Sequence, residues 1–209
     1  SCTTPGAWFG NPEETKAMCR EMNEYGARMV SDYKGRFGLF AVLPLPVIDA
    51  SLKEIEYALD TLKADGVGLM TSYGTRWLGD PTLRPIFDEL NRRKAVVYMH
   101  PLAPPCCVNL NDDVPSAMNE FDFDITRACT SILANGVLHD FPDVKIIIPH
   151  SGGTMPMIAG RIAPVYFHAT RSMTAAMPAW APPSDISVSY CLISTFEKPP
   201  NSASRSSRV

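Results

Sequence analysis

The sequence predicts an α/β fold in which helices cover a parallel sheet. Helical and strand-like segments alternate along the chain, and the strands are short and apolar on both faces, as is typical of parallel sheets. An eight-stranded (β/α)8 barrel takes about 250 residues, so four or five such units within 209 residues indicate the central part of a barrel. A flavodoxin-like open sheet is the alternative, but no GxGxxG or GxxxxGKS phosphate loop supports it.

The first elements follow from start and stop signals. A helix is expected over residues 11–33, because Asn11 can cap it and a proline and two acidic residues follow in the first turn. The strand over 36–43 ends at two prolines. The next helix has apolar residues at helical spacing, and Asp49 or Ser51 is expected to cap it.

The later elements continue the alternation. Asp80 and Pro81 are expected to start a helix after a short buried strand, and a loop rich in proline, asparagine and aspartate interrupts the pattern after residue 101. The expected strands are 67–70, 95–99, 144–148 and 186–192, and the expected helices are 80–94, 116–138 and 153–170.

Two regions are expected, residues 1–175 as the barrel portion and residues 176–209 as an irregular tail. Residues 198–208 have the proline-rich and serine-rich composition of disordered segments. The chain also opens at Ser1 and not at a methionine. We therefore expect a fragment or an imperfect gene model, with a tail that comes from a premature end, a splice variant or a frame error.

Composition excludes several classes of function. A net charge of −3, with no cluster of lysine and arginine, argues against nucleic acid as a partner. The longest apolar stretches fall far short of the roughly 20 residues of a membrane-spanning helix. Six cysteines without CxxC spacing are interpreted as reduced thiols, which predicts a cytoplasmic protein.

Two histidines are the strongest functional signal. His100 and His150 each stand where an apolar strand ends in a loop. Because the carboxyl ends of parallel strands face the active site in barrels and doubly wound sheets, these side chains are expected to point at a substrate or a metal. A packed histidine at position 100, and a glycine-rich turn after position 150, are the structural alternatives.

Four segments of the chain carry a resemblance to a known family. They are residues 35–46 (GRFGLFAVLPLP), 57–67 (YALDTLKADGV), 98–101 (YMHP) and 141–161, which contains HSGG and ends in Gly-Arg. In order and spacing they resemble the amidohydrolase-related family, the branch of the amidohydrolase superfamily that holds aminocarboxymuconate-semialdehyde decarboxylase and γ-resorcylate decarboxylase. Within it the chain is most similar to the fungal 6-methylsalicylate decarboxylases.

The resemblance implies a (β/α)8 barrel with one divalent metal, usually zinc, at the carboxyl ends of the strands. His100 matches the histidine of the HP motif, a metal ligand in the family. His150 matches the histidine of the HxGG motif, a catalytic acid/base beside the metal. Arg161 matches an arginine that holds a substrate carboxylate in a neighbouring subunit's site, and family members are commonly dimers or tetramers.

Other ligands of the family are missing from the sequence. No HxH or ExH motif of the first strand is present, and the tail supplies no strand that ends in the metal-binding aspartate. Catalytic zinc normally takes three ligands from the protein. We therefore expect this polypeptide to bind zinc weakly and to turn over slowly or not at all.

Further residues are candidates for substrate binding. Phe121, Asp122 and Asp124, near the start of the helix after the His100 loop, could line the pocket, as could Trp77. The alternatives are a helix staple for Phe121, N-terminal acids for Asp122 and Asp124, and a surface cation for Arg161. His139 and His168 are interpreted as helix residues and not as ligands.

Three hypotheses for the function remain open. The first is a metal-dependent non-oxidative decarboxylase of a small aromatic carboxylic acid such as 6-methylsalicylate, in which an imidazole manages the ring proton. The second is a metal-dependent hydrolase of a lactone, amide or ester on the same scaffold. The third is a non-catalytic, truncated barrel that serves as an interaction partner.

Overall fold

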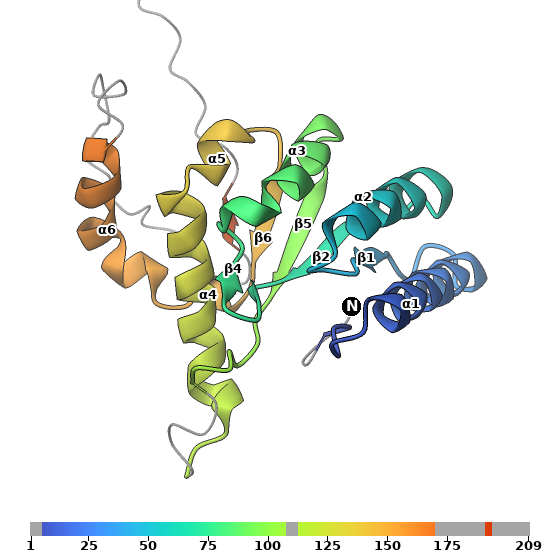
Figure 1. Cartoon of the computed structure of the whole chain (residues 1–209), viewed down its shortest axis with the longest axis horizontal. Coiled ribbons are helices and arrows are strands. Elements are labelled where there is room, and N and C mark those ends of the chain that lie inside the picture. Colours follow the sequence, from blue (N-terminus) through green and yellow to red (C-terminus); the bar gives the residue numbers. More distant parts are fainter. Residues whose placement is uncertain (1–5, 108–112, 170–190, 194–209) are drawn as a thin grey trace, which may run out of the picture.

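The centre of the molecule is a five-stranded, mostly parallel sheet (Figure 1). The computed structural model describes residues 6–107, 113–169 and 191–193. The strand order is β1-β2-β5-β6-β7, with bounds β1 Phe40–Val42, β2 Gly66–Met70, β5 Val96–His100, β6 Lys145–Ile148 and β7 Cys191–Ile193. The α/β prediction is confirmed, and the sheet is not closed into a barrel within the described residues.

Strands β1, β2, β5 and β6 are parallel neighbours in chain order. Parallel neighbouring strands require a crossover connection, and each of these crossovers contains a helix. Strand β7 instead pairs antiparallel with β6, with Leu192 opposite Ile147. The strand predicted over 186–192 is observed only from Cys191, and residues 186–190 lie outside the described residues, as does most of the predicted tail.

Helix α1 (Pro12–Asp32) begins as predicted. The Asn11 side chain accepts hydrogen bonds from the backbone N–H groups of Glu13 and Glu14, which have no partner inside the helix. Further along, the Asn23 amide accepts from the N–H of Val42 at 2.8 Å and donates to its carbonyl at 2.9 Å. This side chain therefore pairs with the outer edge of β1, beside which α1 lies (Figure 1).

The second predicted helix starts earlier than expected. Helix α2 (Ile48–Glu56) has Val47 as its N-cap with no capping side chain, so neither Asp49 nor Ser51 caps it. The Ser51 hydroxyl donates to the carbonyl of Val47 within the helix. A π-helical turn, η1 (Tyr57–Thr61), follows.

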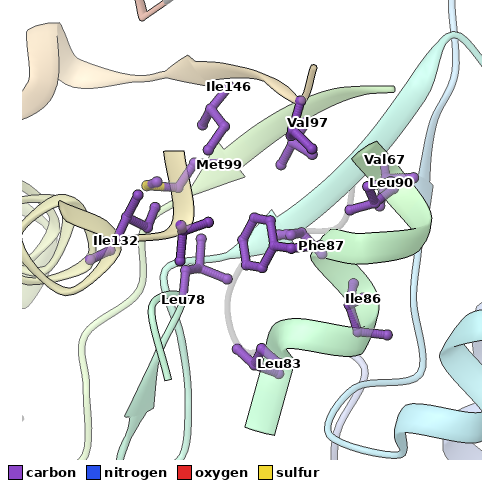
Figure 2. Close-up of a cluster of buried hydrophobic side chains, with 14 of the residues drawn as sticks. Val67, Leu78, Leu83, Ile86, Phe87, Leu90, Val97, Met99, Ile132 and Ile146 are labelled. Carbon is purple, nitrogen blue, oxygen red and sulfur yellow. The ribbon is translucent and has the colours of Figure 1, made fainter. Parts of the chain in front are cut away.

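The helix predicted over 80–94 is confirmed as two continuous pieces. Asp80 caps the 3-10 turn η2 (Pro81–Leu83) by accepting from the N–H of Thr82, and α3 (Arg84–Arg92) follows. Three apolar side chains of α3 are buried, and Figure 2 shows Phe87 among residues of the sheet and of neighbouring helices. Burial of this apolar face stabilises the packing of α3 against the sheet.

The helix predicted over 116–138 is confirmed from residue 116 to residue 134, but its predicted C-terminal end is wrong. The structure has α4 (Ser116–Ala134) and a separate short α5 (Val137–Asp140). Gly136 lies between them with φ +67°, a left-handed conformation that glycine adopts without the steric penalty of a Cβ. Helix α6 (Met155–Ala169) packs beside α4, at the opposite end of the molecule from α1 (Figure 1).

A small antiparallel pair, β3 (Ser72–Tyr73) and β4 (Arg76–Trp77), follows β2 and was not predicted. Strands of two residues leave no periodicity to detect. Within the described ranges, no helix is long and apolar enough to span a bilayer.

Candidate active site

His100 is the last residue of β5, at the carboxyl edge of the sheet. Alternate side chains of a strand point to opposite faces, and in β5 Val97 and Met99 are buried in the core beneath the helices, whereas Tyr98 and His100 are only half-buried. The two faces of the sheet therefore differ. One is the helix-covered core, and the other carries Tyr98 and His100.

The imidazole of His100 has a defined orientation. Its Nδ1 lies 2.7 Å from the carbonyl oxygen of Pro101. Because a carbonyl only accepts, Nδ1 carries the proton and donates it, which leaves the lone pair on Nε2. Metal-ligating histidines typically use their second ring nitrogen in this way, so the orientation of His100 suits a ligand.

His150 lies in an unusual backbone segment directly after β6. His150 and Ser151 have φ +49° and +55°, and Gly152 and Gly153 also have positive φ. Left-handed conformations are uncommon for residues other than glycine, and such strain concentrates at functional sites. The glycines of the HSGG motif do make a reversing turn, as the structural alternative proposed, and that turn also fixes where the imidazole projects.

Contacts with α4 hold this turn in place. The Thr126 hydroxyl donates to the carbonyl of Asp122 at 2.8 Å and accepts from the N–H of Thr154 at 2.9 Å. Gly153 approaches so closely that a Cβ there would lie 2.2 Å from the Asp122 carbonyl oxygen. Only glycine fits at this contact, so the third residue after His150 is selected by packing as well as by φ.

The ring of Phe121 connects the two histidines. Its centroid lies 6.4 Å from that of His100 and 6.1 Å from that of His150, both in edge-to-face geometry. Nδ1 of His150 lies 3.2 Å from Oδ1 of Asp122, the residue next to Phe121. The structure thus brings the two sequence-predicted histidines to one edge of the sheet, with a shared aromatic neighbour.

A small cavity lies on the half-buried face beside His100. Its volume is about 30 Å³, and its walls are residues of β1, β2 and β5 together with the loops that follow β1 and precede α1. This is about the space of one water molecule, whereas pockets for small organic ligands measure about 300–1,000 Å³. The recess beside His100 is therefore water-sized and mostly apolar, and it is too small for an aromatic acid.

A buried carboxylate anchors the carboxyl edge of the sheet. Asp124 is fully buried and accepts hydrogen bonds from the hydroxyl of Thr71, from the hydroxyl of Ser72 at 3.5 Å and from Nε1 of Trp77 at 2.7 Å. Burial raises the pKa of the Asp124 carboxyl, against the lowering effect of its donors. The indole N–H of Trp77, a predicted substrate-binding residue, is therefore committed to Asp124.

Thr71 extends this network to the His100 strand. Its backbone N–H donates to the His100 carbonyl at 2.9 Å, and its hydroxyl accepts from the N–H of Leu102 at 3.3 Å. Asp124 therefore joins β2, the end of β5 and α4. Sequence reasoning did not single out Thr71, because a threonine after a short strand has no distinguishing pattern.

The other candidates lie apart from these contacts. Arg161 is exposed on α6 and makes no ion pair within the described part of the chain. His139 is exposed on α5, and its Nδ1 lies 2.8 Å from Asp140, a contact that lowers the pKa of the Asp140 carboxyl. The backbone of His168 lies in α6.

The residues that the structure describes do not complete a metal site. Among them, no group of three histidine, cysteine, aspartate or glutamate side chains is close enough to share an ion. His100 has a ligand's orientation, but a single imidazole falls short of the three protein ligands of catalytic zinc. The described donor set therefore does not fit a resident metal.

A family model described as Amidohydrolase matches residues 6–196. The chain belongs to the amidohydrolase family. A 6-methylsalicylic acid decarboxylase from Penicillium expansum is 41% identical over 168 residues, which are 78% of this chain and 52% of that protein. The chain therefore spans about half the length of this relative.

Solved amidohydrolase structures share the fold. One titled Amidohydrorolase II has a TM-score of 0.77 at 30% identity and covers 80% of this chain and 55% of that one. A dihydroxybenzoic acid decarboxylase from Polaromonas sp. JS666, with bound manganese and the inhibitor 2-nitroresorcinol, has a TM-score of 0.69 at 19% identity, covering 76% and 51%. The latter likeness concerns the fold alone.

Proposed function

We propose that this chain is the acid/base portion of a non-oxidative decarboxylase that acts on a small aromatic carboxylic acid such as 6-methylsalicylate. The observation that carries the proposal is the placement of His150 and His100 around Phe121 at the carboxyl edge of the sheet. The likeness to a 6-methylsalicylic acid decarboxylase supports the choice of substrate class.

His150 is the proposed proton donor. As the bond between the ring and its carboxylate breaks, the electron pair stays on the ring carbon and CO₂ leaves. That carbon takes a proton from the imidazolium of His150, which becomes neutral and is recharged from water. An imidazole suits this exchange because its ordinary pKa is close to neutrality.

Phe121 is proposed to pack against the aromatic ring of the substrate, since its own ring already lies edge-to-face with both imidazoles. Arg161 is proposed to bind a substrate carboxylate in a neighbouring subunit of a dimer or tetramer, which agrees with its exposure on α6. Trp77 is proposed to border the substrate with its ring, since its N–H is bonded to Asp124.

We propose that the chain contributes to the binding of a divalent ion, zinc or manganese, although the described residues do not form a metal site by themselves. His100 is the proposed ligand, through Nε2, because Pro101 holds its Nδ1. Since the described residues offer no second and third ligand nearby, we propose that the chain binds such an ion weakly. Metal content after purification well below one ion per chain is the expected result, and near-stoichiometric zinc would contradict it.

CO₂ release from 6-methylsalicylate, with added Mn²⁺ or Zn²⁺, tests the function. We expect slow release above the uncatalysed rate, reduced by about 10²–10⁴-fold in His150→Gln or to the background. Hydrolysis of a lactone or ester without CO₂ release would favour a hydrolase. Failure to process either class at saturating metal would favour a non-catalytic interaction partner.

A further inference from the structure

The contact between His150 and Asp122 joins two residues 28 positions apart in the sequence. Nδ1 of His150 lies 3.2 Å from Oδ1 of Asp122, and the two side chains are 44% and 49% exposed. Exposed pairs of this kind contribute little to stability. We therefore infer that this contact orients the imidazole of His150 and adds little to stability.

Asp122 is not explained as a helix N-terminal acid. Helix α4 begins at Ser116, so Asp122 lies beyond the first turn, where the helix dipole favours negative charge. Phe121 is likewise too far along α4 to be a hydrophobic staple. Neither the helix staple nor the N-terminal acid therefore explains Phe121 and Asp122. Both residues instead lie close to His150.

The backbones of both partners are held independently of the contact itself. The left-handed φ values of His150 and Ser151 direct the imidazole, and the Thr126 hydroxyl with Gly153 presses the turn onto the Asp122 carbonyl. The packing of the two backbones therefore brings the carboxylate of Asp122 close to the imidazole of His150.

The charge of Asp122 favours one tautomer of His150. An ionised carboxylate attracts an N–H and repels a nitrogen lone pair, so the Nδ1 that lies 3.2 Å from Asp122 is expected to carry the proton. The lone pair of the neutral imidazole is then on Nε2. The carbonyl of Pro101 imposes the same tautomer on His100, so both imidazoles beside Phe121 keep Nε2 available.

We propose that Asp122 is a positioning residue that holds His150 as the Nδ1–H tautomer and leaves Nε2 to exchange protons with a bound molecule. Asp122 acts through His150 and does not itself touch the substrate. The tautomer part of this inference stands on the geometry of the chain, whereas its catalytic consequence rests on the proposed function.

The tautomer of His150 can be measured by ¹⁵N NMR of the imidazole nitrogens at a pH where the ring is neutral. The signals of His150 are those that disappear in His150→Gln. In the unmodified chain Nδ1 is expected to carry the proton. In Asp122→Ala the ratio is expected to shift about two- to five-fold toward Nε2–H, the range for an exposed charged pair.

Asp88→Ala is the matched control, because Asp88 is an exposed acid on α3 outside the contacts described for His150. Asp122→Asn keeps the side-chain volume and serves as a second variant if alanine disturbs folding. An unchanged ratio in both Asp122 variants, with the amide spectrum of the fold preserved, would overturn the inference.

CO₂ release separates this inference from the proposed function. Because Asp122 is proposed to act through the tautomer of His150, Asp122→Ala is expected to slow release by about the same two- to five-fold, with substrate binding retained. Equal release by Asp122→Ala and the unmodified chain would refute the positioning role. No release by the unmodified chain, together with the tautomer shift, would refute the decarboxylase alone and support the pairing.

Discussion

Replacement of Asp124 by alanine tests whether the buried carboxylate holds the carboxyl edge of the sheet together. The side chain is fully buried and accepts from Thr71, Ser72 and Trp77. These donors come from the residue after β2 and from the β3–β4 pair, whereas Asp124 belongs to α4. The change therefore removes a connection among three segments.

The magnitude follows from what each donor can do afterwards. The two hydroxyls can rotate to other acceptors, but the indole N–H of Trp77 is fixed by its ring. A buried donor without a partner costs about 1–3 kcal/mol, and a lost hydrogen bond to a charged group about 1.5–3 kcal/mol. Relief of the desolvation that raises the Asp124 pKa offsets part of this. We expect a net loss of about 2–4 kcal/mol in the free energy of unfolding.

Urea denaturation followed by far-ultraviolet circular dichroism measures this loss. Asp122→Ala is the matched control, because Asp122 lies on the same helix, two residues earlier, and is half-exposed. The control is expected to change the free energy of unfolding by less than about 0.5 kcal/mol. If Asp124→Ala were as stable as the control, the network would not contribute as described.

Three further predictions concern packing and pH. Phe87→Ala is expected to lower the free energy of unfolding by about 3–5 kcal/mol, measured by urea denaturation, because a fully buried ring is lost; a loss below 1 kcal/mol would show a core that collapses to refill the space. Gly153→Ala would place a Cβ 2.2 Å from the Asp122 carbonyl oxygen, at a φ of +60°. We therefore expect the free energy of unfolding to fall by at least about 1–3 kcal/mol in the same assay, and the NMR signals of His150 to shift. An unperturbed NMR spectrum would argue against this close approach. Hydrogen bonds from Arg92 and Arg93 lower the pKa of Glu89 from 4.5 to about 2. The contribution of the Glu89 carboxylate to stability is therefore present above pH 4.5 and is lost as the pH falls toward 2. Urea midpoints between those pH values should therefore fall more steeply for the unmodified chain than for Glu89→Gln, and equal slopes would contradict the pairing.

Local signals were sufficient for most of the sheet. The four parallel strands are short apolar runs bounded by glycine, proline or charged residues, and Asn11 and Asp80 cap helices as their side-chain chemistry predicts. The strand over 36–43 was predicted too long, because only Phe40–Val42 pairs with β2. Apolar composition predicts which residues enter the core, whereas the ends of a strand depend on where the neighbouring strand stops pairing with it.

Other features needed tertiary information. The break between α4 and α5 had a visible signal, Asn135 followed by Gly136, which helical spacing on both sides concealed. The placement of His100 and His150 at one edge followed from the rule for parallel strands. The same rule does not predict the partners that orient them, Pro101 and Asp122. Only the close packing of the HSGG turn on α4 brings Asp122 to His150.

The shared site requires that both imidazoles contact the ring of Phe121 in solution. Nuclear Overhauser effects between ring protons measure this without substrate or metal. We expect cross-peaks from Phe121 to the imidazoles of both His100 and His150, and none to His139 on α5. A cross-peak to only one of the two histidines would place them at separate sites and would contradict a shared active site.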